Sequence, residues 1–190
     1  PDVTVTLNIA AKQACDLPFM TAFCAALGET GLAERFVLEL TEEAFFTTGR
    51  FQREVLPKIR AIGARVSIDD FGVGYSSLSA LADITADEIK IDRSFITDIH
   101  KRPRSQSILK AIESLSEALG MTVVAEGIET FEELAYLQAA TKIRYGQGFY
   151  FAKPVLLDKG ELRAAQEGPS RLAADGRSQQ GPRVVSASRG

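Results

Sequence analysis

The sequence contains a single histidine, His100, and only two cysteines, Cys15 and Cys24. Ser-His-Asp and Cys-His catalytic systems need an imidazole, and zinc sites are usually built from several His and Cys side chains. Two cysteines are also too few for a disulfide framework, so we expect a reducing compartment and a cytoplasmic location. Any catalytic chemistry should therefore come from carboxylates, amides and lysine.

Long apolar runs and an excess of positive charge are also missing. No run approaches the roughly 18 apolar residues of a membrane span, and the first residues do not resemble a signal peptide. With 22 basic and 25 acidic residues, the net charge is −3, which disfavours a nucleic-acid partner. The length of 190 residues and the hydrophobic content of 45% fit one globular domain. Because the chain begins with Pro1, we expect it to be part of a longer protein.

Short β-branched or apolar runs alternate with stretches of helical periodicity, which predicts an α/β fold with a parallel sheet. The expected strands are 3–9, 36–40, 65–69, 88–91, 122–126 and 148–151, and the expected helices are 17–29, 51–62, 77–82, 105–119, 131–140 and 158–166. From residue 167 the chain is rich in Gly, Ser, Arg, Gln and Pro without a period. We therefore expect a domain over residues 1–166 and a disordered tail over 167–190.

Polar side chains close five of the predicted strands: Asn8, Glu39, Asp69 with Asp70, Lys90, and Glu126. The carboxyl ends of parallel strands converge on the ligand crevice or barrel mouth. One polar strand end can be explained as a helix N-cap, but five in one chain favour a functional site.

Several of these positions also have a purely structural interpretation. The adjacent Asp69 and Asp70 repel each other unless a cation lies between them, but an Asx-turn is equally compatible with them. Lys90 could orient a water or bind a phosphate oxygen, or could form a structural ion pair. Glu42 could supply charge at a helix start.

Helix capping explains only part of the segment at the end of the strand predicted at 122–126. Thr130 lies at the capping-box distance from Glu133, which accounts for Thr130 but not for Glu126. Carboxylate and amide oxygens without His or Cys suit Mg²⁺ or Mn²⁺. Two such ions about 4 Å apart can clamp the attacking and leaving oxygens of a phosphodiester. Metal-assisted phosphodiester hydrolysis is therefore the leading reaction class.

Taken together, these strand ends resemble the EAL-domain cyclic di-GMP phosphodiesterases. The matching stretches are Leu7-Asn8-Ile9, Glu39-Leu40-Thr41-Glu42, Asp69-Asp70-Phe71-Gly72-Val73-Gly74-Tyr75-Ser76-Ser77-Leu78, Lys90-Ile91-Asp92-Arg93-Ser94-Phe95, Ala125-Glu126-Gly127-Ile128-Glu129-Thr130 and Gly146-Gln147-Gly148-Phe149-Tyr150-Phe151 with Pro154. The resemblance implies a modified TIM-type (β/α)8 barrel with its site at the mouth. About six of the eight β/α units would be present here.

The resemblance also implies roles for single residues and for partners. The implied metal ligands for two Mg²⁺ or Mn²⁺ ions are Asn8, Glu39, Asp69, Asp70 and Glu126. Lys90 would hold the attacking water, Glu126 could act as a base, Gln147 and Glu129 would support the site, and Glu42 would anchor the loop that begins at Asp70. Cyclic di-GMP would be opened to linear pGpG. The resemblance also implies a homodimer and upstream sensory or cyclase domains in the full-length protein, which could be tethered to a membrane through segments outside this chain.

Three departures from the family pattern affect these expectations. Ala10 and Val73 replace a serine and a threonine, and the Glu-Ala-Leu segment with its metal ligand is absent. We therefore expect the isolated chain to be inactive and self-associated. A non-catalytic cyclic di-GMP receptor is the main alternative to the enzyme, and a barrel acting on another phosphorylated metabolite is a third interpretation.

Overall fold

The computed structural model describes residues 3–42, 49–73, 85–154, 170–171 and 183–186. Its strands are β1 (Val3–Asn8), β2 (Phe36–Thr41), β3 (Arg65–Phe71), β4 (Glu88–Ile91), β5 (Thr122–Ala125), β6 (Tyr145–Gly146), β7 (Ser170–Arg171) and β8 (Arg183–Ser186). They form one sheet in the order β7-β6-β5-β4-β3-β2-β1-β8. Neighbouring strands from β1 to β6 are parallel, as the sequence predicts.

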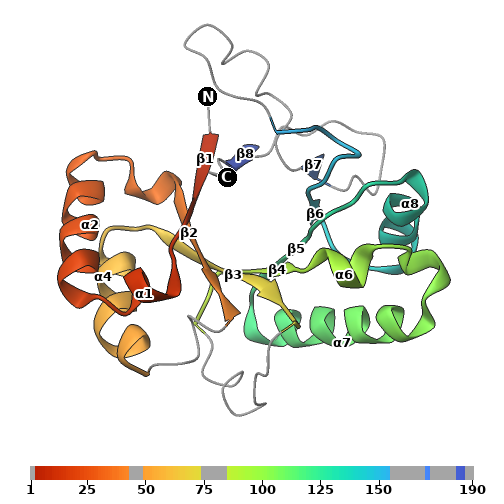
Figure 1. Cartoon of the computed structure of the whole chain (residues 1–190), viewed down its shortest axis with the longest axis horizontal. Coiled ribbons are helices and arrows are strands. Elements are labelled where there is room, and N and C mark those ends of the chain that lie inside the picture. The colour runs from red at the N-terminus through yellow and green to blue at the C-terminus, as the bar shows by residue number, and fades with distance from the viewer. Residues whose placement is uncertain (1–2, 43–48, 74–84, 155–169, 172–182, 187–190) are drawn as a thin grey trace, which may run out of the picture.

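Helices cover the outer side of this curled sheet. They are α1 (Ala11–Ala14), α2 (Leu17–Glu29), η1 (Ala33–Arg35), η2 (Phe51–Val55), α4 (Leu56–Ala61), α6 (Arg93–Ile96), η3 (Ile99–Lys101), α7 (Pro103–Leu119) and α8 (Phe131–Ala140). Figure 1 shows an open arc of strands, with α2 and α4 outside one half and α7 and α8 outside the other. This is the incomplete TIM-type barrel that the sequence predicts. Within the described ranges, no helix has the length and apolar character needed to span a membrane.

Alternation along the strands separates an apolar face from a polar one. The apolar strand residues are buried in the hydrophobic core: Leu38, Leu40, Val66, Ile68, Ile89 and Ile91. The residues between them include Glu39, Ser67 and Lys90, which are buried but polar. Successive strand residues point to opposite faces, so the apolar set packs under the helices and the polar set lines the inside of the arc. A polar barrel interior is thus built into the strand sequences.

Local capping explains where two of the helices begin. Asp16 accepts a hydrogen bond from the Phe19 amide at 3.0 Å at the start of α2. At the start of α8, the predicted capping box is confirmed: Thr130 Oγ1 accepts from the Glu133 amide at 3.3 Å, and Glu133 Oε2 accepts from the Thr130 amide at 3.0 Å. Each cap satisfies backbone N–H groups that have no partner within the helix.

The predicted sixth strand at 148–151 is wrong, because the strand lies at Tyr145–Gly146 and residues 148–151 form a turn. The Phe151 amide donates to the Gly148 carbonyl at 3.0 Å. Gly148 has φ +156°, and a Cβ there would lie 2.1 Å from the Ile128 carbonyl oxygen. The close approach of Gly148 to the Ile128 backbone therefore decides the conformation of residues 148–151. The apolar composition of this segment does not indicate that contact.

Other differences concern short elements and helix ends. The sequence pattern did not predict α1 and α6, which are single turns of four residues each. Helix α7 begins at Pro103, two residues before the predicted start of 105, because proline is favoured in the first turn. The helices predicted at 77–82 and 158–166 lie outside the described residues.

Two short segments of the tail predicted to be disordered are strands. β8 pairs in parallel with β1, and β7 pairs antiparallel with β6. β7 and β8 are therefore the outermost strands of the sheet, and they pair with backbone groups that β6 and β1 would otherwise leave open at its edges. For the remaining positions of 167–190, which are not described, disorder stays a prediction.

Candidate functional site

Lys90 is the centre of the polar cluster at the carboxyl ends of the strands. The side chain projects from β4 and the residue is only 4% exposed. Lys90 Nζ lies 2.8 Å from Glu39 Oε1, 3.0 Å from Asp69 Oδ1 and 2.5 Å from Glu126 Oε1. These carboxylates come from β2, β3 and the residue after β5. The sheet order thus brings together four of the side chains that the sequence analysis selected.

Burial and charge act in opposite directions on this cluster. Burial alone would lower the pKa of Lys90, but Glu126, Glu39 and Asp69 outweigh it and raise that pKa above its ordinary value. Burial raises the pKa of Glu126 to about 7, even though Lys90 opposes the shift. Burial likewise raises the pKa of Glu39 against the effect of Lys90. One ammonium facing three carboxylates leaves an excess of negative charge that favours binding of a cation.

Asp69 and Asp70 both reach the cluster because β3 is irregular. The β3–β4 register shifts between Ile68 and Phe71, and Asp70 adopts a left-handed conformation with φ 53°. In a regular strand, adjacent side chains would point to opposite faces, whereas a bulge re-aims one of them. One oxygen each from Asp69, Asp70 and Glu126 lies within 4.8 Å of the others. Burial and then the Asp69 charge raise the pKa of Asp70.

Glu42 fixes the start of the segment that follows Asp70. Glu42 is 5% exposed, and its Oε2 accepts a hydrogen bond from the Gly72 amide at 3.0 Å. Gly72 has φ +97°, and a Cβ at this position would lie 3.0 Å from the ring of Phe95. The hydrogen bond between Glu42 and Gly72 links the residue after β2 to the residue after β3. Glu42 therefore does more than supply charge at a helix start, which is the structural role that the sequence also allowed. The motif residues after Val73 up to position 84 lie outside the described residues.

The remaining predicted site residues, Gln147, Asn8 and Glu129, differ in their contacts and exposure. Gln147 Nε2 donates to Glu126 Oε1, so Gln147 belongs to the cluster. Asn8 is exposed at the end of β1 and pairs in register with Glu39. Glu129 is exposed, and among the described residues only its backbone amide, which donates to Glu133, has a hydrogen bond. Among the described residues, no hydrogen bond or ion pair joins the Glu129 side chain to the Lys90 cluster.

Below this cluster lies a polar layer that the sequence analysis missed. Ser67 Oγ donates to Glu88 Oε1 at 3.0 Å, and Ser67 is fully buried. Burial raises the pKa of Glu88, while Ser67 and Lys90 oppose that shift. Glu88 is two residues before Lys90 and Ser67 two before Asp69, so this spacing along each strand could have placed them on the same face. Asp92, which lies two residues after Lys90, is the N-cap of α6. Its side chain accepts a hydrogen bond from the Ser94 amide at 2.9 Å.

Comparison with other sequences gives a consistent result. The chain is 41% identical over 155 residues to cyclic di-GMP phosphodiesterase PdeR of Escherichia coli, which covers 81% of this chain and 23% of that protein. It is 41% identical over 133 residues to cyclic di-GMP phosphodiesterase NbdA of Pseudomonas aeruginosa, which covers 70% of this chain and 17% of that protein. The chain thus spans about a quarter or less of the length of these curated relatives.

Comparison with solved structures places the fold in the same group. The structure of BlrP1 from Klebsiella pneumoniae in a manganese/cyclic di-GMP complex superposes with a TM-score of 0.72 and 37% identity, covering 80% of this chain and 39% of that one. A BlrP1 calcium/cyclic di-GMP complex gives the same values. The sequence profile of the family described as EAL domain matches residues 1–154. The chain therefore belongs to the EAL domain family.

Proposed function

We propose that this chain forms most of a metal-dependent phosphodiesterase domain that hydrolyses cyclic di-GMP to linear pGpG. The observation that carries the proposal is the buried Lys90 ammonium held between Glu39, Asp69 and Glu126 at the mouth of the barrel. The names of PdeR and NbdA and the cyclic di-GMP complexes of BlrP1 support the same substrate.

The proposed metal ligands are the oxygen donors at the strand ends: Asn8, Glu39, Asp69, Asp70 and Glu126. The convergence of Asp69, Asp70 and Glu126 oxygens within 4.8 Å fits a hard divalent cation. The excess of carboxylates over ammonium groups fits the same conclusion. When bound, two Mg²⁺ or Mn²⁺ ions would supply Lewis-acid stabilisation of the phosphodiester oxygens and lower the pKa of a bound water.

The residues of this chain would bind and orient the reacting groups. Lys90 Nζ, with its three N–H donors, would hold the attacking water or a phosphate oxygen in place of one of its present carboxylate partners. Glu126 would accept the proton of that water, and Gln147 Nε2 would orient the Glu126 carboxylate. Glu42 would hold the backbone at Gly72 and thereby the position of Asp70. Glu129 would support the site near the substrate.

We propose that the complete site also contains residues that lie outside this 190-residue sequence. We propose a barrel domain ending near residue 166 and completed by a preceding segment that bears the family's Glu-Ala-Leu motif. Below, "completed domain" means this chain extended by that segment. We further propose that the whole protein is cytoplasmic and homodimeric, with sensory or cyclase domains preceding the barrel. The larger size of PdeR and NbdA supports additional domains.

The experiment that tests the proposal is separation of nucleotide products after incubating the completed domain with cyclic di-GMP and Mn²⁺. The proposal expects pGpG from the unmodified domain and none from Asp69→Asn or Glu39→Gln, because each substitution removes charge that holds an ion. Circular dichroism should show that both variants fold. Binding of cyclic di-GMP without product in the unmodified domain would instead identify a receptor, an outcome with which Ala10 and Val73 would agree.

A further inference from the structure

A cavity away from the Lys90 cluster lies between α6 and the start of α7. Its volume is about 560 Å³, and it is lined by Ser94, Phe95, Arg102, Pro103, Arg104, Ser105 and Ile108. Ligand-binding pockets commonly have volumes of about 300–1,000 Å³. None of these residues belongs to the Lys90 cluster, so the proposed hydrolysis does not account for the cavity.

Two arginines, Arg102 and Arg104, bring positive charge to this cavity. Arg102 Nη1 donates to the carbonyl oxygens of Ser94 and Thr97 at 2.6 and 3.2 Å, and Arg104 is exposed without an ion pair to any described residue. Asp98 forms an ion pair with Lys101 at 3.0 Å, which lowers the pKa of Asp98, and the charge of Arg102 adds to that lowering. Arg104 therefore offers a guanidinium that has no ion-pair partner among the described residues, and such a group suits a phosphate or carboxylate.

The first turn of α7 adds hydrogen-bond donors at the same place. This helix has 17 residues, its N-cap residue Arg102 makes no side-chain cap, and Pro103 carries no N–H. The amides of Arg104 and Ser105 have no hydrogen-bond acceptor among the described residues. The unpaired N–H groups of a helix N-terminus, together with the helix dipole, attract anions.

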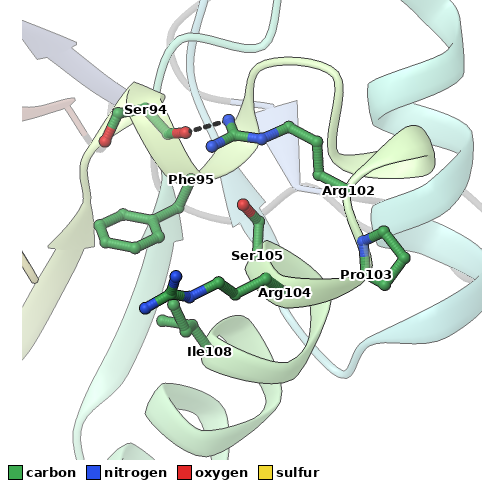
Figure 2. A pocket seen from close by; sticks show the side chains of 7 residues that line it. All are labelled: Ser94, Phe95, Arg102, Pro103, Arg104, Ser105 and Ile108. Carbon is green, nitrogen blue, oxygen red and sulfur yellow. Dashed lines mark hydrogen bonds between the residues drawn. The ribbon is translucent and has the colours of Figure 1, made fainter.

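The Ser105 side chain is an independent indication of a ligand. Ser105 is only 4% exposed and lines the cavity, yet within the described part of the chain its hydroxyl has no hydrogen-bond partner. Figure 2 shows this hydroxyl pointing toward the space between Phe95 and Arg102. A hydroxyl of a largely buried residue normally has a hydrogen-bond partner. An anion seated at the start of α7 would supply one.

The rest of the cavity is apolar. The ring of Phe95 and the side chain of Ile108 form part of its wall, and Arg104 extends past Ile108 in Figure 2. A planar group can stack on an aromatic ring or on a guanidinium. We propose that this cavity binds a small phosphate monoester of an aromatic group, with the phosphate at Arg104, Ser105 and the α7 N-terminus and the aromatic group against Phe95 and Ile108.

Calorimetric titration of the completed domain tests this site with phenyl phosphate, inorganic phosphate and phenol, in EDTA so that no metal ion is bound. We expect phenyl phosphate to bind more tightly than either fragment. Arg104→Gln should weaken that binding about tenfold, as expected for one charge-assisted hydrogen bond. Ser105→Ala should weaken it less.

Lys110→Gln is the matched control, because it removes one positive charge from an exposed position of the same helix. It should leave phenyl phosphate binding unchanged. The proposal is overturned if phenyl phosphate does not bind, if phenol or inorganic phosphate binds as tightly, or if Lys110→Gln weakens binding as much as Arg104→Gln. Amide shifts of Arg104 and Ser105 in NMR spectra of the unmodified domain provide a second readout that needs no variant. The absence of such shifts on titration with phenyl phosphate would equally overturn the proposal.

Discussion

Replacing Lys90 by methionine should expose how strongly the carboxylate cluster depends on one ammonium. Lys90 is 4% exposed, and its Nζ lies within 3.0 Å of oxygens of Glu39, Asp69 and Glu126. Methionine retains much of the side-chain volume but leaves three carboxylates without a cation. Breaking a buried ion pair by removing one partner typically costs about 3–5 kcal/mol. We expect a loss of that size in the free energy of unfolding of the metal-free completed domain at pH 8.

The pH dependence of that loss identifies its cause. Lys90 lowers the pKa of Glu39 and of Glu126, so its removal should raise both further. A carboxyl whose pKa is raised in the folded state binds more protons there than in the unfolded state, so stability falls as pH rises from the unfolded value of about 4.3 through the folded value. The folded variant can neutralise its carboxylates at low pH, and the destabilisation at pH 5 should be about half of that at pH 8.

Urea unfolding of the unmodified and Lys90→Met domains at both pH values measures this difference. Lys142→Met is the control, because Lys142 forms an ion pair with Glu117 in which both side chains are more than half exposed. Such a surface pair contributes little to stability. Equal stabilities of Lys90→Met and the unmodified domain at pH 8 would refute the reasoning, and so would a destabilisation independent of pH.

Three further predictions concern the loop anchor, metal binding and the isolated chain. Glu42→Gln weakens the hydrogen bond to the Gly72 amide and should lower Mn²⁺-dependent turnover about tenfold while leaving the circular dichroism spectrum unchanged; unchanged turnover would contradict the anchoring role. Because the pKa of Glu126 is raised to about 7, a metal ion must displace its proton, so calorimetric Mn²⁺ affinity should rise between pH 6 and pH 8, and Glu126→Gln should remove much of that rise. A pH-independent affinity in the unmodified domain would contradict this. The 190-residue chain alone should scatter light as a self-associated species and lack diesterase activity, because its barrel is open; a monomer that hydrolyses cyclic di-GMP would contradict it.

The sequence predicts those parts of the fold that depend on local patterns. The runs around Val66 and Ile89 are apolar because those strands are buried, and the Thr130 capping box marks the start of α8 to the residue. The misplaced sixth strand shows the opposite case. Gly148 is held by contact with the Ile128 backbone, and no local pattern reports a contact between segments 20 residues apart.

The site likewise combines features that local sequence patterns predict with features that depend on contacts between distant segments. Polar strand ends predict that Glu39, Lys90 and Glu126 meet, because parallel strands place their carboxyl ends together. That Asp69 and Asp70 both face the site depends on the irregular β3–β4 register, which spacing cannot reveal. The Glu88–Ser67 contact joins neighbouring strands inside the barrel, so it depends on sheet order as well as on the spacing within each strand.

The most direct test of the central claim is to measure turnover and binding of cyclic di-GMP in parallel for the completed domain and its Lys90→Ala variant with Mn²⁺. If Lys90 holds the attacking water, its loss removes an interaction that matters mainly in the transition state. The account predicts that the unmodified domain forms pGpG and that Lys90→Ala lowers kcat far more than it weakens binding. Equal losses in turnover and affinity would contradict the role of Lys90, and binding without pGpG in the unmodified domain would contradict the enzyme itself.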